Sequence, residues 1–240
     1  LGNGSDEIFQ MVGLSYLNPG DEVLISEYTF SVYEHIARVS CAKPVIVPSK
    51  DFGVDLHGML DYLNDRTKVI FIANPNSPTG TFLSESDLRS FLDHVPPSVL
   101  VVLDEGYAEY TPKKIRVNAL SLIESYPNVL VTRTFSKLYG LAGFRVGYGI
   151  SQKTIIDTLH KVRMPFNVSS VSLHAAYLAS NNTSFVSKSI EVNQKGLSAF
   201  HEYFQKNGKD LRQTAANFVF IELIKDASDV SAKLAEKGII

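Results

Sequence analysis

A lysine within a hydroxyl-rich segment is the residue of this sequence with the clearest capacity for chemistry. The segment is Thr132-Arg133-Thr134-Phe135-Ser136-Lys137, and Arg145 follows eight residues after the lysine. Hydroxyls and a guanidinium are suitable donors to a phosphate dianion, and the glycines between the two cations let backbone approach a ligand closely. A lysine in such a place becomes a nucleophile when desolvation or a neighbouring cation lowers its pKa. The same residues also suit a surface loop with an ordinary solvated lysine.

An aspartate stands at the end of an apolar run. Asp104 follows Val99–Leu103, and ligands of open α/β sheets bind outside the carboxyl ends of the strands. A carboxylate there is costly unless something pairs with it, and a pyridinium N–H would do so while keeping the ring an electron sink. Tyr107 is close enough to reach a phenolate oxygen of such a ring. A metal ligand, a helix cap or a Walker B carboxylate are the alternatives, but the chain has no G-x-x-x-x-G-K-[ST] loop.

Two further polar segments lie next to the expected ends of regular elements. Asn74-Pro75-Asn76-Ser77-Pro78-Thr79-Gly80 directly follows an apolar run, and it predicts a rigid turn in which either prolyl bond can be cis. Gly2-Asn3-Gly4-Ser5-Asp6-Glu7 opens a helix, whose N–H groups and dipole favour an anion. A plain turn and a good N-cap are the alternatives for these two segments.

The bulk composition argues against nucleic-acid and membrane partners. The 240 residues are 45% hydrophobic and 20% charged with a net charge of -2, so no global field gathers nucleic acid or an anionic membrane. No apolar run reaches the roughly 18–20 residues that cross a membrane. The single cysteine, Cys41, allows no intrachain disulfide, which suits the cytosol, and we expect its thiol to be buried.

The remaining motifs exclude two classes of enzyme. The six histidines show no HxH or HExxH spacing, so no metal cluster can be built from them. No G-x-S-x-G elbow is present, which argues against a serine hydrolase. A generic α/β binding module would not explain why the ligand-type residues fall at the expected carboxyl ends of strands.

Short apolar runs alternate with helical segments in the first 150 residues. Unbroken β-branched runs are typical of strands buried on both faces of a sheet. The alternation therefore predicts an α/β fold with a mainly parallel sheet. The predicted helices include Ser5 to about Tyr16 and a segment that opens at Ser84 and stops before Pro96. The predicted strands are Val23–Ile25, Val45–Val47, Val69–Ile72, Val99–Leu103 and Val129–Val131.

After about residue 150 the pattern becomes mostly helical. Helices are expected at 155–162, 171–179, 184–206 and 230–237, with a strand at Asn217–Leu223. These segments predict a connecting helix and the start of a smaller α+β domain. The chain opens without a methionine and ends at Gly238-Ile239-Ile240, which reads as a helix C-cap glycine and the start of a strand. We therefore expect a chain that is truncated at both ends.

In their order along the chain, these motifs resemble those of a known family. GNGSDE, EYTF, NPNSPTG, DEGY and TFSKLYGLAGFRVGY are similar to the motifs of the fold-type I, class I/II pyridoxal-phosphate-dependent aminotransferases, and most closely to the histidinol-phosphate aminotransferases. The resemblance covers essentially the whole chain. It implies a large cofactor-binding domain at 1–185 with a mainly parallel seven-stranded sheet between helices. Residues 186–240 would be a long connecting helix and part of a small C-terminal domain, in a cytoplasmic homodimer.

The resemblance also implies roles for individual residues. Lys137 would hold pyridoxal 5'-phosphate as a Schiff base and move a proton, with Asp104 on the pyridine nitrogen and Tyr107 on the phenolic oxygen of the ring. Phe30 would stack on the ring, because stacking requires only an aromatic face. The phosphate would be held by Gly4, Ser5, the backbone at Asp6, Thr134, Ser136 and Arg145.

The chain departs from the family pattern in two respects. The family usually reads Asn-Pro-Thr-Gly with that asparagine on the ring oxygen, whereas this chain has Ser77 there and Asn76 one place earlier, so both are candidates. The family's upstream tyrosine, which crosses the dimer interface, and its C-terminal arginine for the substrate carboxylate lie outside this chain.

The resemblance implies a transamination of histidine biosynthesis. Histidinol phosphate and 2-oxoglutarate would be converted to imidazole-acetol phosphate and glutamate. An aromatic or broad-specificity aminotransferase and a threonine-phosphate decarboxylase are the alternatives with the same cofactor chemistry. A non-catalytic cofactor-sensing domain of a winged-helix regulator is the alternative from another class, and it would carry the same lysine, aspartate and arginine.

Overall fold

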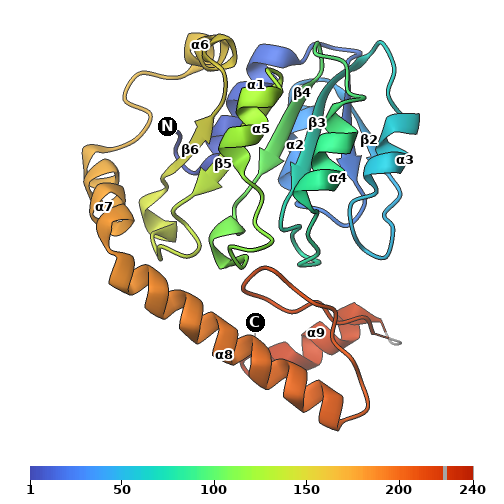
Figure 1. Ribbon diagram of the computed structural model, residues 1–240, viewed down its shortest axis with the longest axis vertical. Coiled ribbons are helices and arrows are strands. Elements are labelled where there is room, and N and C mark those ends of the chain that lie inside the picture. The colour runs from blue at the N-terminus through green and yellow to red at the C-terminus, as the bar shows by residue number, and fades with distance from the viewer. Residues whose placement is uncertain (224–225, 240) are drawn as a thin grey trace.

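Six strands form a single sheet in the computed structural model, which describes residues 1–223 and 226–239 (Figure 1). Their order across the sheet is β2-β1-β3-β4-β5-β6. All neighbours are parallel except β5 and β6, which are antiparallel. The strands are β1 (Glu22–Ser26), β2 (Lys43–Val47), β3 (Thr67–Ala73), β4 (Leu100–Asp104), β5 (Val129–Thr134) and β6 (Gly147–Ile150).

The mainly parallel α/β fold that the sequence predicts is confirmed. The five predicted apolar runs are all strands, and β1 and β4 are buried at every position, as expected for strands covered on both faces. The described residues contain six strands, compared with the seven that the resemblance implies. The antiparallel edge strand β6 was not predicted, because no apolar run in the sequence indicates it.

Helices cover both faces of the sheet. In Figure 1, α3, α4 and α5 lie in front of it and α1 and α2 lie behind it. The helices that precede residue 165 are α1 (Ser5–Tyr16), α2 (Val32–Val39), α3 (Leu56–Asp61), α4 (Glu85–Leu92), α5 (Ala119–Ser125) and α6 (Lys153–Val162). Two single-turn 3-10 helices, η1 (Ala108–Tyr110) and η2 (Ala142–Phe144), follow β4 and β5.

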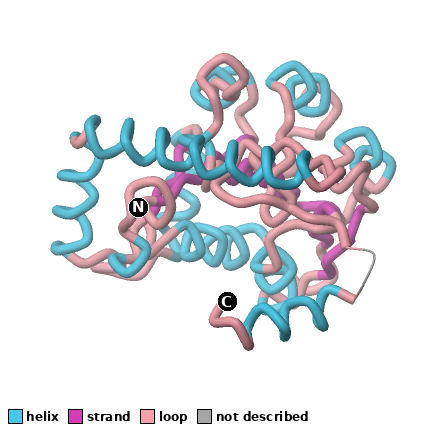
Figure 2. Tube along the Cα trace, turned by 90° about the horizontal axis from the view of Figure 1, so that it is seen from below, coloured by secondary structure: helices cyan, strands magenta, loops and turns pink. Residues whose placement is uncertain are grey.

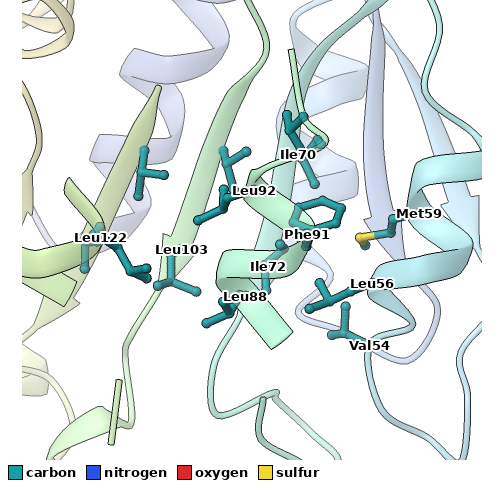
Figure 3. Packing of buried hydrophobic residues seen from close by; sticks show 14 of the residues in the cluster. Val54, Leu56, Met59, Ile70, Ile72, Leu88, Phe91, Leu92, Leu103 and Leu122 are labelled. Carbon is teal, nitrogen blue, oxygen red and sulfur yellow. The ribbon is translucent and has the colours of Figure 1, made fainter. Parts of the chain in front are cut away.

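Each face of the sheet has its own hydrophobic core. On the front face, Phe91 of α4 packs with Met59 of α3 and Ile72 of β3 (Figure 3). On the rear face, Phe9 of α1 and Phe71 of β3 meet edge to face with their ring centroids 5.7 Å apart. Burial on both sides holds the strands in register, and this register determines which residues meet at the carboxyl edge of the sheet.

The part of the chain from residue 170 onward lies below the carboxyl edge of the parallel strands in Figure 1. It consists of α7 (Ser170–Asn181), α8 (Thr183–Lys206), residues 207–223 and α9 (Ala227–Ala235). Figure 2, seen from below, shows the long helix α8 crossing in front of the strands. Helix α8 buries none of its residues, so little apolar packing holds it to the rest of the chain.

The strand predicted at Asn217–Leu223 is wrong, because this stretch has no regular secondary structure. The two residues that precede it instead bond to other elements. The Thr111 hydroxyl donates to the Ala215 carbonyl, and the Asn193 amide of α8 donates to the Ala216 carbonyl. An alternating pattern makes a strand only where a neighbouring strand accepts its backbone bonds, and the described residues offer none here.

Two smaller expectations can also be compared with the structure. Cys41 is exposed rather than buried, because it occupies a turn after α2 with a left-handed φ of 57°. The strand expected to start at Ile239–Ile240 falls partly outside the described residues. Within those residues, no helix is both long and apolar enough to pass through a membrane.

Candidate active site

A cavity lies at the carboxyl ends of the parallel strands. Every site residue predicted from the sequence lines it except Gly4 and Asn76. These residues come from segments as far apart as the start of α1 and the loop after β5, so the fold brings the separate motifs together. The lining residues are Ser5, Asp6, Phe30, Ala73, Pro75, Ser77, Asp104, Gly106, Tyr107, Thr134, Ser136, Lys137 and Arg145.

One end of the cavity collects donors suited to an anion. The Arg145 guanidinium donates to Asp6 at 2.9 Å and to the Ser136 hydroxyl at 3.3 Å. Ser5 and Asp6 occupy the first turn of α1, where the positive end of the helix dipole adds to the charge of the arginine. Thr134 accepts a bond from the backbone N–H of Ser136, which shapes the loop that follows β5.

Gly4 contributes to this end by lacking a side chain. A Cβ at this position would lie 2.5 Å from a guanidinium nitrogen of Arg145, and the φ of 79° is one that side-chain-bearing residues rarely adopt. Gly147 of β6 also contributes by lacking a side chain, since a Cβ at this position would lie 2.6 Å from the backbone nitrogen of Ser5. The two glycines therefore let the start of α1 approach Arg145 and β6.

The other end of the cavity holds a buried carboxylate. Asp104 is 8% exposed at the end of β4, paired in register with Ala73 of β3 and Thr132 of β5. Its donors among the described residues are neutral: the Tyr33 hydroxyl at 2.7 Å, the Thr132 hydroxyl at 3.0 Å and the backbone N–H of Gly106. Burial raises the pKa of Asp104, and the bonds from Tyr33 and Thr132 oppose that rise.

Sequence reasoning missed the contributions of Tyr33 and Thr132. Thr132 was recognised only as the start of a hydroxyl-rich segment, although its place at the end of a strand next to β4 was a usable signal. Tyr33 belongs to α2 and lies 71 residues before its partner Asp104. No local pattern in the sequence connects these two residues.

Lys137 reaches the cavity from the loop after β5. Its side-chain nitrogen lies 5.1 Å from the centre of the Tyr107 ring. The ring of Phe218, which belongs to residues 207–223, packs perpendicular to the same tyrosine ring. Lys137 is exposed in this structure. The described residues therefore do not shield its amine from water, which is one of the two conditions that the sequence analysis gave for a nucleophilic lysine. An exposed amine at the mouth of a cavity is accessible to an incoming carbonyl compound.

The turn after β3 distinguishes Asn76 from Ser77. The Asn76 amide donates to the Tyr28 carbonyl and to Thr79, and its oxygen accepts from Thr29, so both ends of this buried side chain are engaged. Ser77, in contrast, lines the cavity. Both prolyl bonds of this turn are cis. Of the two candidates, Ser77 is the one that a ligand in the cavity would meet.

A buried ion pair lies beside the site. Glu105 is 1% exposed, and one of its carboxylate oxygens accepts two bonds from Arg133, at 2.8 and 2.7 Å. Burial raises the pKa of Glu105 even though Arg133 opposes the rise. Because Glu105 follows Asp104 and Arg133 follows Thr132, this pair joins β4 to β5 at the level of the cavity.

Comparisons with known proteins agree over the whole length of the chain. A family model described as aminotransferase class I and II matches residues 1–240. Histidinol-phosphate aminotransferase 1 of Idiomarina loihiensis is 42% identical over 240 residues, 100% of this chain and 65% of the relative. Histidinol-phosphate aminotransferase of Moorella thermoacetica is 43% identical over 241 residues, 100% of this chain and 62% of the relative.

A solved structure is also similar. The crystal structure of histidinol-phosphate aminotransferase from Sinorhizobium meliloti in complex with pyridoxal-5'-phosphate matches with a TM-score of 0.93 and 28% sequence identity. The match covers 100% of this chain and 66% of that chain. The chain thus spans between 62% and 66% of the length of these three proteins.

The raised pKa of Asp104 predicts a pH-dependent stability. Its contribution to the free energy of unfolding is complete below the ordinary carboxyl pKa of 3.8 and is lost as pH rises through the raised pKa. We expect Asp104→Asn, prepared without ligand, to gain stability relative to wild type over that range and then level off. Urea unfolding at a series of pH values between 4 and 8 measures this difference.

Glu22→Gln is the matched control with the opposite sign. The Asn64 amide bond lowers the pKa of Glu22, so this carboxylate stabilises the fold at neutral pH and loses its effect as pH falls through the lowered pKa. We expect Glu22→Gln to be less stable than wild type at neutral pH, with the deficit shrinking in acid. A constant difference between Asp104→Asn and wild type at all pH values would contradict the prediction.

Proposed function

This chain belongs to the class I and II aminotransferases, and we propose that it is the main part of a pyridoxal-phosphate-dependent transaminase. The proposed reaction converts histidinol phosphate and 2-oxoglutarate to imidazole-acetol phosphate and glutamate, a step of histidine biosynthesis. The observation that carries the proposal is the single cavity where Asp104, Lys137 and Arg145 meet. The substrate is supported by the names of relatives that are 42% and 43% identical to this chain.

The residues present fit pyridoxal phosphate. Asp104 is a buried carboxylate with only neutral donors among the described residues, so a protonated ring nitrogen would supply the missing opposite charge. Arg145, Ser136 and the start of α1 would hold the phosphate. Phe30 would cover a face of the ring, and Ser77 and Tyr107 are the candidates for its phenolic oxygen.

Each residue of the site has a role in the proposed reaction. When bound, pyridoxal phosphate supplies an electron-accepting ring. Lys137 would hold the cofactor through its Nζ and would move the proton at the substrate α-carbon as general base and acid. Asp104 would keep the ring nitrogen protonated, and Tyr107 would fix the orientation of the ring by its hydroxyl.

We also propose a division of the chain into two parts. Residues 1–185 would form the large cofactor-binding domain, and residues 186–240 the long connecting helix and part of a small C-terminal domain. The confinement of all six strands of the described residues to the first 150 positions supports this division. The absence of buried residues in α8 is consistent with a connecting role. We place the protein in the cytoplasm, which its single cysteine suits and which cell fractionation would test.

We further propose that two copies of the protein form a homodimer. Four apolar side chains of η2, the loop before α7 and the first turn of α7 are 42–96% exposed: Phe144, Met164, Phe166 and Val171. The Ser172 hydroxyl donates to the Phe144 carbonyl, which joins the first turn of α7 to η2 next to Arg145. Large exposed apolar side chains on consecutive or contacting segments favour an interface with another chain.

Lys137→Ala tests the chemistry. We expect the variant to lose the visible absorbance of the lysine-bound cofactor and to lower kcat at least about 100-fold, because the general base is removed. Borohydride reduction of wild type followed by peptide mapping should place the cofactor on Lys137. Lys153→Ala, at a lysine whose side chain is 86% exposed on α6, is the control and should behave like wild type. Normal turnover by Lys137→Ala, or a modified peptide without Lys137, would contradict the assignment of Lys137 as the lysine that holds the cofactor.

A substrate panel tests the specificity. We expect kcat/KM for histidinol phosphate, with 2-oxoglutarate as acceptor, to exceed that for phenylalanine by at least about tenfold, a difference of about 1.4 kcal/mol in transition-state binding. Threonine phosphate should give no release of carbon dioxide. Preference for phenylalanine would favour the broad-specificity alternative. Decarboxylation of threonine phosphate would favour the decarboxylase, and binding without turnover would favour a regulatory domain.

Phe166→Asp tests the homodimer. Phe166 is 96% exposed with a φ of 57°, and an aromatic residue of this kind at the centre of an interface is worth about 2 kcal/mol or more. Sedimentation equilibrium should give a dimer for wild type and a dissociation constant at least about tenfold higher for the variant. Leu120→Asp, at an exposed position on α5, is the control. A monomeric wild type, or equal effects of the two substitutions, would argue against this surface.

A further inference from the structure

Tyr33 is a fully buried residue that touches the acidic end of the site without lining the cavity. It lies in the first turn of α2, is 0% exposed, and donates its hydroxyl to Oδ2 of Asp104 at 2.7 Å. A hydrogen bond to an ionised carboxylate is stronger than one between neutral groups. The hydroxyl therefore stabilises the charged form of Asp104, while burial of that carboxyl disfavours it.

Aromatic packing holds the Tyr33 hydroxyl in place. Its ring stacks on Phe71 of β3 with centroids 4.7 Å apart and planes 5° apart, and it meets Phe9 of α1 edge to face at 5.4 Å. Because both neighbours belong to the rear core, the tyrosine ring cannot turn without disturbing that core. The donor is therefore oriented before any ligand arrives.

The two oxygens of Asp104 are held by different elements. Tyr33 of α2 bonds to Oδ2, whereas Thr132 of β5 bonds to Oδ1 at 3.0 Å. With a side-chain donor on each oxygen, the plane of the carboxylate is determined by the fold. Tyr33 also meets Phe30, the aromatic wall of the cavity, edge to face at 5.6 Å. It thus contacts two parts of the site at once.

We propose that Tyr33 is a positioning residue, which keeps Asp104 charged and aimed into the cavity and supports Phe30 behind the bound ring. This inference rests on the proposed function, because Asp104 is argued to bind the ring nitrogen of pyridoxal phosphate. Tyr33 itself touches neither cofactor nor substrate. Its effect reaches the reaction through the charge and orientation of Asp104.

Other charged or titratable groups that face Asp104 must stay unchanged for a test to be clear. They are Asp6 from α1, Tyr107 from the segment after β4, and Lys137 and Arg145 from the loop after β5. Tyr33→Phe preserves all of them, together with the aromatic stacking, and removes only the hydroxyl. A change in the behaviour of Asp104 in this variant is then due to the lost donor.

The test measures cofactor binding against pH. In the Tyr33→Phe holoenzyme, the pH below which pyridoxal phosphate affinity falls should move upward, and affinity at neutral pH should fall about tenfold, the effect of losing a hydrogen bond to a charged group. The acidic limb of the pH profile of kcat/KM should also move to higher pH. Replacing Tyr33 with 3-fluorotyrosine, a stronger donor of similar size, should move both limbs downward, which keeps the test informative if Tyr33→Phe folds poorly.

Tyr126→Phe is the matched control. The Tyr126 hydroxyl donates to Oδ1 of Asp93 at the same 2.7 Å, but this pair lies between α4 and the end of α5, away from the cavity. Cofactor affinity and both pH profiles of this variant should match wild type. Profiles of Tyr33→Phe that superimpose on wild type would overturn the positioning role while leaving the proposed function intact. Failure of wild type to bind pyridoxal phosphate at any pH would instead remove the proposed function, and this inference with it.

Discussion

A buried carboxylate whose hydrogen-bond donors, among the described residues, are all neutral is the constraint on which this site depends. The sheet places Asp104 at the end of β4, between β3 and β5, where burial disfavours its charge. Neutral donors from α2 and β5 lessen that cost without removing it. A residue chosen for stability alone would be apolar or an amide here. The local conflict between charge and burial therefore marks the position as functional.

The opposite end of the cavity has the complementary charge. Arg145 and the start of α1 are 139 residues apart in sequence, and the short bridge between Gly2 and Gly147 brings them together. Asp6 already pairs with Arg145, so this end is partly neutralised within the chain. A ligand with a protonated nitrogen at one end and a phosphate at the other would be oriented by both ends of the cavity at once.

The positions of Asp104 and Lys137 could be predicted because they obey a simple rule. Apolar runs identify parallel strands, and ligands bind where those strands end. Tyr33 obeys no such rule, since its contact with Asp104 depends on how α2 packs on the sheet. The pattern at Asn217–Leu223 misled for a related reason, because alternation indicates two different faces but not the presence of a partner strand. Cys41 became exposed through a turn that hydrophobic periodicity does not encode.

The turn after β3 shows that two adjacent polar residues have different roles. Asn76 joins the segment after β1 to the turn itself through bonds with Tyr28, Thr29 and Thr79, so its replacement would leave buried groups without partners. Ser77 makes no such side-chain bonds to the described residues, and it lines the cavity. A serine is shorter than the asparagine usual in the family, so on the proposed function its reach toward the ring oxygen is less. Orientation of the ring then depends more heavily on Asp104 at the nitrogen, on Tyr107 and on the phosphate contacts.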